Sequence, residues 1–342
     1  MTWLLRDCKI TLTIHKEIGE IIMINFIGNF ADNKFVQVIG ILCAFFATFL
    51  ALKYLSNLLP KDAGREFAHD GKKSAGKPRG AGIIFILAFA IISLIFAKTT
   101  GEMLIYILIT VASMLTGYLD DAAKNPWGEY KKGILDFILA FLVAGTYLYF
   151  NSNEILINTV GKSVTLNPVL FFVLAVILVW TSINVTNCTD GVDGLSGTLS
   201  VITLFTIYLI GSINGKNLDF NYVILILIIC IIAYLWFNAT PSKLMMGDAG
   251  SRALGIFIAI AILKTGSPLL YIPVALMLII DGGLGFIKIS FRRFLKIQVL
   301  KNVRTPIHDH VRKNGDWSNT QVVFRFAIIQ IIIAVCVIYL IK

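Results

Sequence analysis

The chain has 342 residues, of which 57% belong to the hydrophobic set AVILMFWYC and only 15% are charged, and its mean hydropathy is +0.81. Soluble globular proteins are more polar than this, so the composition excludes a soluble protein, a disordered chain and a coiled coil, and it predicts a polytopic membrane protein. The net charge of +10 is interpreted as a signal of membrane topology and anionic headgroups, and nucleic acid is not expected as a partner.

Residues 1–35 precede the first long apolar run and are expected to form an N-terminal tail. The apolar stretch from Ile21 to Phe30 is too short to span a membrane and lacks a small-residue cleavage site, so it is a poor signal peptide. Two interpretations remain open. Either Met23 is the true start and residues 1–22 are an over-called extension, or the segment is a disordered extracytoplasmic tail.

Residues 36–342 are expected to form a single transmembrane domain. A helix needs about 20 apolar residues to cross the bilayer core, and ten runs approach that length. They are residues 36–59, 80–97, 102–119, 134–150, 168–186, 196–213, 221–238, 252–265, 268–290 and 322–341. We therefore predict an all-α polytopic integral membrane protein with about ten transmembrane helices and both termini on the same side.

Positive charge predicts the orientation. The connections after the first, third, seventh and ninth spans carry most of the Lys and Arg residues. Those after the second, fourth, sixth and eighth carry only Lys98, Lys162, Lys216 and Lys264. Because basic residues concentrate in cytoplasmic loops, the first set is expected in the cytoplasm and both termini outside.

Two adjacent carboxylates, Asp120 and Asp121, end the third predicted span. Neighbouring side chains on a helix point in different directions. From a helix end, however, both can serve one site, one binding a cation and the other accepting a proton or a hydrogen bond. The alternative is a solvated acidic pair. The functional interpretation is favoured because the predicted cytoplasmic connections contain little other acid.

A polar segment from Asn184 to Leu195 lies between two apolar spans and contains two Asn, two Thr, two Asp and two Gly residues. Asn and Asp tolerate turn conformations, and glycine lets the backbone approach a ligand closely. The D-x-x-D-G spacing is similar to a calcium loop but lacks the distal Glu of an EF-hand. So many polar groups beside lipid indicate a binding site rather than a simple turn.

The segment from Asn238 to Ser251 places Asp248 between Gly247 and Gly250, just ahead of the eighth span. A carboxylate in a tight glycine turn is a good ligand for a hard cation. Asp also fills helix N-caps well, and the two roles are compatible at one residue.

In the long basic loop before the last span, His308 and His310 alternate around Asp309. On an extended strand these three side chains cannot easily chelate one transition-metal ion, so contact with phosphate is the expected use. Together the four clusters predict one cytoplasmic face with carboxylates for Mg²⁺ and basic groups for phosphates. Mg²⁺ keeps waters and shares phosphates, so few acids suffice. Such a face suits a phosphorylated soluble donor and a phosphorylated lipid acceptor.

These motifs resemble those of the polyprenyl-phosphate N-acetylhexosamine-1-phosphate transferases, in the same order and from about Leu59 to the C-terminus. The shared patterns are LDD at 119–121, NxTDGxDGL at 187–195, NxxPxxxxMGDxGS at 238–251 and PIHxH at 306–310. The last is most similar to the branch that transfers phospho-N-acetylmuramoyl-pentapeptide. Two departures change the charge near the expected nucleotide and sugar. The usual triple His reads His-Asp-His at 308–310, and the usual TPTMGG reads KPRGAG at 77–82.

The resemblance implies a reaction and a set of roles. Undecaprenyl phosphate would attack the β-phosphorus of a UDP-linked N-acetylhexosamine and release UMP, with Mg²⁺ as cofactor and Mn²⁺ as a substitute. The implied catalytic residues are Asp120, Asp121, Asp248 and His308, of which Asp248 and Asp121 would bind the metal. The implied substrate-binding residues are Lys77, Lys124, Lys132, Asn187, Asp190, Asp193, Asn238 and His310, with Lys132 preferred over Lys131.

For this branch the implied product is lipid I of peptidoglycan synthesis, made at the cytoplasmic face of the bacterial inner membrane, and a homodimer is compatible with it. A first alternative keeps the chemistry but uses UDP-N-acetylglucosamine or another UDP-HexNAc for other surface glycans. A second is a lipid transporter or flippase, which would show inverted repeats and polar residues at mid-membrane, and the sequence shows neither. Asp136 and Asp281 are instead expected to pair with neighbours in the helix bundle.

Overall fold

The computed structural model describes residues 13–15, 21–23, 33–62, 64, 74–215 and 217–341. Of the N-terminal tail it describes an antiparallel pair of short strands, β1 (Thr13–His15) and β2 (Ile21–Met23), and the residues that begin the first helix. The remainder of the tail lies outside the described residues. Both interpretations of this segment therefore stay predictions.

Helices occupy the predicted spans. They are α1 (Lys34–Leu55), α2 (Gly82–Phe96), α3 (Gly101–Asp121), α4 (Glu129–Phe150), α5 (Pro168–Thr189), α6 (Leu195–Asn214), α7 (Leu218–Asn238), α8 (Gly247–Lys264) and α13 (Asn319–Ile341). Within the described residues, seven helices are long and apolar enough to cross a membrane, and a bent pair raises this to eight. The all-α polytopic membrane fold is confirmed, whereas ten spans and extracytoplasmic termini stay predictions.

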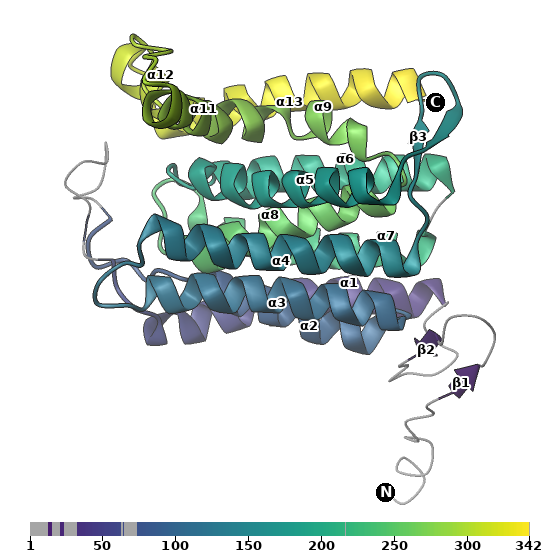
Figure 1. The fold of residues 1–342 in the computed structure, drawn as a ribbon. Helices are drawn as coiled ribbons and strands as arrows, with labels where there is room; N and C mark the ends of the chain where they lie inside the picture. Colours follow the sequence, from purple (N-terminus) through teal and green to yellow (C-terminus); the bar gives the residue numbers. More distant parts are fainter. Residues whose placement is uncertain are drawn as a thin grey trace, which may run out of the picture.

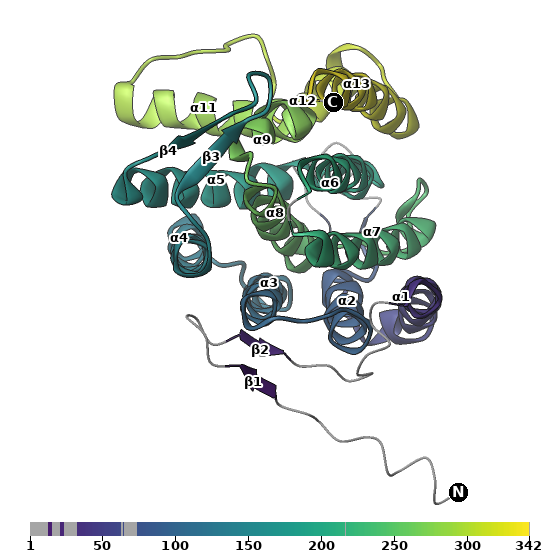
Figure 2. The ribbon, with the colours of Figure 1, turned by 90° about the vertical axis from the view of Figure 1, so that its right-hand side faces the viewer.

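The helices lie side by side with their axes roughly aligned (Figure 1), and the view along the bundle places α8 near its middle (Figure 2). Every residue of α8 is buried. Helices α3 and α5 pack against it at close range, because Gly117 of α3 lies against the backbone of Asp248, and Gly255 of α8 lies against the backbone of Ser182. A Cβ atom at either glycine would collide with that backbone, so small residues set the spacing of the central helices.

The charged residues buried inside the bundle are paired. Arg252 of α8 donates to the Asp136 carboxylate from Nε at 3.1 Å and from Nη2 at 2.5 Å. Lys264 donates to Glu102 at 2.7 Å and to the side-chain oxygen of Asn151 at 3.0 Å. The expected pairing of Asp136 inside the bundle is confirmed. It allows α8 to carry charge at the centre of the fold, where an unpaired charge would be costly.

The ninth predicted span, residues 268–290, is broken rather than continuous. The pair Pro268–Val274 and Leu276–Lys288 is bent by 67°, and the chain passes through α9 (Tyr271–Val274), α10 (Leu276–Leu278), a π-helical segment at Ile279–Gly283 and α11 (Leu284–Ser290). Gln330 of α13 makes the break tolerable, because its side chain accepts from Met277 N at 2.9 Å and donates to Val274 O at 2.9 Å. Backbone groups freed at membrane depth need such partners.

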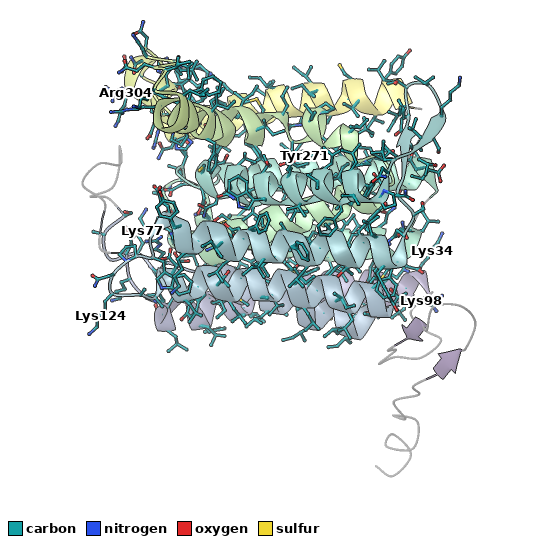
Figure 3. All side chains as sticks on the ribbon, viewed as in Figure 1. Lys34, Lys77, Lys98, Lys124, Tyr271 and Arg304 are labelled. Carbon is teal, nitrogen blue, oxygen red and sulfur yellow. The ribbon has the colours of Figure 1, made fainter. Side chains whose placement is uncertain are left out.

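The two ends of the bundle differ in the connections that they carry. Figure 3 places Lys77, Lys124 and Arg304 at one end of the bundle and Lys34 and Lys98 at the other. The charge pattern had assigned Lys98 to the side opposite Lys77, Lys124 and Arg304. The second end carries an antiparallel hairpin that the sequence did not predict, β3 (Glu154–Ile157) and β4 (Lys162–Thr165). The first end carries α12 (Ile307–Asn314), in the long basic loop.

The buried Asp136–Arg252 pair gives a test of the packing. Asp136→Ala leaves the Arg252 guanidinium buried without its carboxylate and should lower the free energy of unfolding by about 3–5 kcal/mol. Asp219→Asn, at an exposed position in the first turn of α7, is the control and should change it by no more than about 0.5 kcal/mol. Thermal unfolding in detergent measures both. An Asp136→Ala protein as stable as the control would contradict a structural role for the pair.

Candidate active site

A polar cavity of about 680 Å³ opens at the end of the bundle that carries Lys77 and α12. Its size is in the usual range for small-molecule sites. The four sequence clusters are far apart in the chain, yet three of them reach its lining: the α5–α6 connection, the segment from α7 into α8, and α12. The predicted site residues that line it are Lys77, Asn187, Asp190, Asp193, Asn238, Asp248 and His308.

Asp248 lies in the first turn of α8, at the point where two cations meet. Its Oδ2 accepts a hydrogen bond from Lys132 Nζ at 2.9 Å, and its Oδ1 lies 3.8 Å from Arg79 Nη2. The N-cap position of α8 belongs to Met246, which provides no side-chain hydrogen bond. The N-cap interpretation of Asp248 is therefore wrong, and its carboxylate points into the charged cluster instead.

Asp120 and Asp121 each connect to Asp248 through one of these cations. Lys132 forms an ion pair with Asp120 as well as with Asp248. Arg79 Nε lies 2.9 Å from Asp121 Oδ1. The adjacent acids thus point to different partners but meet in one cluster, which fits the hypothesis that they serve a single site.

Arg79 remains positively charged in this setting. Burial alone would lower the pKa of its guanidinium, but Asp121, Asp248 and Asp62 raise that pKa above its ordinary value. In the sequence, Arg79 was noted only as part of a departure from the family pattern, whereas Lys77 of the same segment was an implied substrate-binding residue. A basic residue between proline and glycine, in the loop that enters the second span, was the available signal for its role.

The start of α8 is folded tightly against Asp121. Gly247 has φ +68°, in the left-handed region, and a Cβ atom there would collide with the Asp121 carboxylate. Asp121 Oδ2 also accepts from Ala249 N at 3.0 Å. Glycine at 247 therefore allows the chain to turn into α8 while the two carboxylates remain close.

Another part of the cavity lining is held by a network of neutral and charged hydrogen bonds. Lys77 Nζ donates to Ser242 Oγ at 3.0 Å and lies 3.8 Å from Asp193 Oδ2, which also accepts from Ser242 N at 3.2 Å. Asn238 accepts from Gly194 N at 2.8 Å and donates to Leu244 O at 2.9 Å. Both polar atoms of the Asn238 amide thus bond to backbone groups, so this side chain holds the lining in place.

The polar segment before α6 is more helical than the sequence indicated. Helix α5 continues to Thr189, so only Asp190–Gly194 forms the connection to α6. Asn187, on the last turn of α5, donates to Ser251 Oγ of α8 at 2.9 Å. This contact ties the end of α5 to the helix that bears Asp248.

His308 lies on a helix rather than on an extended strand, so the extended interpretation of this loop was wrong. His308 N donates to Asp281 Oδ1 at 2.7 Å, and His308 Nδ1 lies 2.8 Å from Asp281 Oδ2. Asp281 was expected to pair with a neighbouring helix of the bundle. It pairs instead with the connecting helix α12. The contact with Asp281 orients the ring so that Nε2 lies on the side of Gly191, which lines the cavity.

Five predicted site residues lie outside the cavity lining. Asp120, Asp121 and Lys132 belong to the carboxylate cluster beside it, whereas His310 and Lys124 belong to neither. His310 accepts from Arg304 N at 3.3 Å on another side of α12, and Lys124 is exposed. The structure also separates the two candidate lysines at the start of α4. Lys132 enters the carboxylate cluster, whereas Lys131 lies 3.3 Å from the centroid of the Trp127 ring.

Gly247→Ala tests the tight turn beside Asp121. The new methyl group must push the Asp121 carboxylate aside and hold the left-handed conformation, which costs about 1–2 kcal/mol for the backbone alone, so the apparent melting temperature should fall. Gly133→Ala, inside α4 with open space around it, should raise stability by about 0.5–1 kcal/mol. Equal shifts for the two variants in thermal unfolding would show that Gly247 has no special role.

Comparison with known proteins extends the likeness beyond the motifs. Residues 103–266 match the family described as glycosyl transferase family 4. A phospho-N-acetylmuramoyl-pentapeptide-transferase of Treponema pallidum (strain Nichols) is 37% identical over 314 residues, 85% of this chain and 85% of that relative. One of the same name from Dictyoglomus turgidum is 32% identical over 300 residues, 86% and 94% of the two chains. Because this similarity covers most of both proteins, the chain belongs to the family of the phospho-N-acetylmuramoyl-pentapeptide-transferases and is a transferase enzyme.

Proposed function

We propose that this protein transfers phospho-N-acetylmuramoyl-pentapeptide from its UDP donor to undecaprenyl phosphate, releasing UMP and forming lipid I. The reaction would take place at the cytoplasmic face of the bacterial inner membrane. The observation that carries the proposal is the cluster in which Asp120, Asp121 and Asp248 share Lys132 and Arg79, at the edge of a cavity large enough for a nucleotide. The names of the relatives supply the donor.

The cations around the cavity suit a diphosphate. Lys77, Arg79 and Arg312 line it, and each is held by a carboxylate, at Asp193, Asp121 and Asp309 respectively. A cation that a carboxylate already holds in place can also bind a donor phosphate without large movement. Such preorganised positive charges favour electrostatic stabilisation of the transferred group. One of the adjacent acids at 120 and 121 would activate the lipid phosphate, and Nε2 of His308 would contact a phosphate or the sugar.

The carboxylate set fits Mg²⁺. Asp121 and Asp248 both approach the guanidinium of Arg79, so their oxygens already converge on one positive charge. Oxygen ligands suit Mg²⁺ or Mn²⁺ better than zinc. Among the described residues no group of three or more His, Cys, Asp or Glu could hold a metal by itself, so waters and substrate phosphates would complete the shell. Bound there, Mg²⁺ would neutralise charge on the phosphates.

A muramoyl-pentapeptide donor is supported by the loop from Ile289 to Ser318, which is long and basic and could reach a peptide beyond the sugar. Asp309, within that loop, would by itself repel an anionic donor. Its Oδ1, however, accepts from Arg312 Nη2 at 2.6 Å. That ion pair offsets the repulsion, so the His-Asp-His departure is compatible with an anionic donor.

Competition between donors tests the proposed function directly. We expect UDP-N-acetylmuramoyl-pentapeptide to exceed UDP-N-acetylglucosamine by at least about tenfold in kcat/KM, a difference of about 1.4 kcal/mol that one good polar contact can supply. Purified protein is incubated with undecaprenyl phosphate, Mg²⁺ and both donors, and the two lipid products are quantified. Preference for UDP-N-acetylglucosamine would assign the protein to other surface glycans.

Lys132→Met tests the bridge between Asp120 and Asp248. Loss of this cation should reduce kcat by about 100-fold, the usual effect of removing one preorganised electrostatic group. Lys131→Met is the matched control, since it removes the same charge from the adjacent position that lies against Trp127, and it should change kcat by less than about threefold. Similar losses in UMP release for both variants would contradict the assignment of Lys132.

Asp248→Asn tests the metal site. The amide keeps the shape of the side chain but loses the negative charge, so UMP release should fall by about 100-fold or more while thermal stability is kept. EDTA should abolish release by the wild-type protein, and Mg²⁺ or Mn²⁺ should restore it. Undiminished release in excess chelator would contradict a metal-assisted reaction, and wild-type turnover by Asp248→Asn would exclude Asp248 as a ligand.

A further inference from the structure

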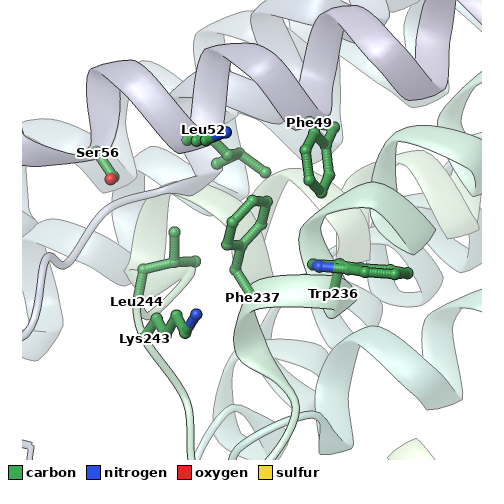
Figure 4. Close-up of a pocket in the computed structure, with 8 residues that line it drawn as sticks. Phe49, Leu52, Ser56, Trp236, Phe237, Lys243 and Leu244 are labelled. Atoms are coloured by element: carbon green, nitrogen blue, oxygen red, sulfur yellow. The ribbon is translucent and has the colours of Figure 1, made fainter.

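A second cavity, of about 370 Å³, lies between α1 and α7 near the end of the bundle that carries the active site (Figure 4). Aromatic rings form one wall: the Phe49 centroid lies 5.0 Å from that of Phe237 and 5.9 Å from that of Trp236. Leu52 and Leu244 are buried at its base. We call this cavity the α1–α7 groove.

The α1–α7 groove is continuous with the outer, apolar face of the bundle. Trp236 is 70% exposed, and Phe46, Leu50 and Tyr54 of α1 are also exposed beside it. In a protein with this many membrane-spanning helices, such a surface faces lipid. The groove therefore opens toward the bilayer, close to the level at which its helices end.

Two lysines, Lys53 and Lys243, line the α1–α7 groove and are exposed. Within the described part of the chain neither has a carboxylate partner; Lys53 Nζ lies 5.3 Å from the centroid of the Tyr54 ring. In contrast, Lys77, Lys132 and Lys264 are each paired with a carboxylate. The groove thus combines an aromatic wall with two exposed positive charges.

We propose that the α1–α7 groove binds an anionic phospholipid of the cytoplasmic leaflet, with its phosphate between Lys53 and Lys243 and an acyl chain along Phe49, Trp236 and Phe237. The chemistry is complementary on both counts. Lysines near the membrane surface attract anionic headgroups, and tryptophan with one apolar and one polar side favours that depth.

The acceptor lipid is the less suitable occupant. An attacking phosphate must reach the carboxylate cluster, but none of the described residues that line the α1–α7 groove is a carboxylate. The segment 239–246 separates the two cavities: Thr240, Pro241, Ser242 and Met245 face the active site, while Lys243 and Leu244 face the groove. A phosphate held by Lys243 is therefore on the wrong side of that segment for transfer.

Through the segment 239–246, a lipid bound in the groove can affect the rate of the reaction. This consequence rests on the proposed function. Lys243 N donates to Phe237 O at 2.8 Å, and its neighbour Ser242 bonds both Lys77 and Asp193 in the active site. A headgroup that fixes Lys243 also restrains this wall of the active site. Turnover should then rise with the fraction of anionic phospholipid.

Binding is measured first, without any substrate. The full chain is reconstituted in nanodiscs with spin-labelled phosphatidylglycerol or phosphatidylcholine, and the motionally restricted fraction of each label gives its relative affinity. Wild type should prefer phosphatidylglycerol. Lys53→Gln and Lys243→Gln should each reduce that preference about fivefold, which corresponds to about 1 kcal/mol per lysine near the surface. Lys53→Arg/Lys243→Arg should retain it.

Lys61→Gln is the matched control, because it removes one exposed positive charge from the connection that follows α1 but lies outside the groove lining. Its lipid preference should equal that of wild type. Equal loss in Lys61→Gln, or no preference in wild type, would overturn the proposal. Displacement of spin-labelled phosphatidylglycerol by excess undecaprenyl phosphate, together with a raised KM for that acceptor in Lys243→Gln, would also overturn it and assign the groove to the acceptor.

Turnover is measured second, in bilayers of increasing phosphatidylglycerol content with both substrates saturating. Wild-type kcat should rise severalfold, and Lys53→Gln/Lys243→Gln should respond weakly while Lys61→Gln responds normally. A protein that turns over no UDP-sugar but keeps the lysine-dependent lipid preference would refute the proposed function alone. Normal turnover with no lysine-dependent preference would refute the lipid site alone.

Discussion

Three carboxylates meet where α3 ends and α8 begins, and their mutual repulsion is the constraint on which the site depends. Two unit charges about 4 Å apart interact by about 4 kcal/mol at an effective dielectric constant of 20. Lys132 and Arg79 offset this by each contacting two of the acids. Because Arg79 comes from the loop before α2 and Lys132 from the start of α4, the charged cluster can form only when these separate segments fold onto α8.

This arrangement leaves more negative than positive charge, since Asp62 also lies 3.7 Å from Arg79. Under the proposed function, donor phosphates enter this cavity, and an excess of carboxylate charge there is unfavourable unless a further cation binds with them. The proposed binding of Mg²⁺ together with the donor would supply that cation. The inner charges behave differently: Asp136 and Arg252 are paired with each other deep in the bundle, which stabilises α8.

Short-range patterns predicted most of the fold, because the length of an apolar run and the presence of turn residues are local properties of the sequence. The sequence placed nine helices well and located the clusters around Asp120, Asp190, Asp248 and His308. It could not supply contacts between distant residues. The pairing of Lys132 with Asp248 spans 116 positions, and the break in the ninth span depends on Gln330 of α13. The helix that carries His308 was missed because it is short and only Ile307 and Val311 of its eight residues are apolar. Its position also depends on a contact with Asp281, which is distant in the sequence.

The sequence alone does not distinguish basic residues that serve the active site from those that face the membrane. The topology rule treats every lysine and arginine of the predicted cytoplasmic connections alike. The structure separates them by environment. Lys77, Arg79 and Lys132 are partly buried among carboxylates beside the cavity. Lys243 instead lies among aromatic side chains at the lipid-facing surface, although its neighbour Ser242 lines the active-site cavity. A single run of chain, residues 239–246, thus lines the active-site cavity on one face and the α1–α7 groove on the other. The proposed transfer from a soluble donor to a lipid requires such a segment between the two environments.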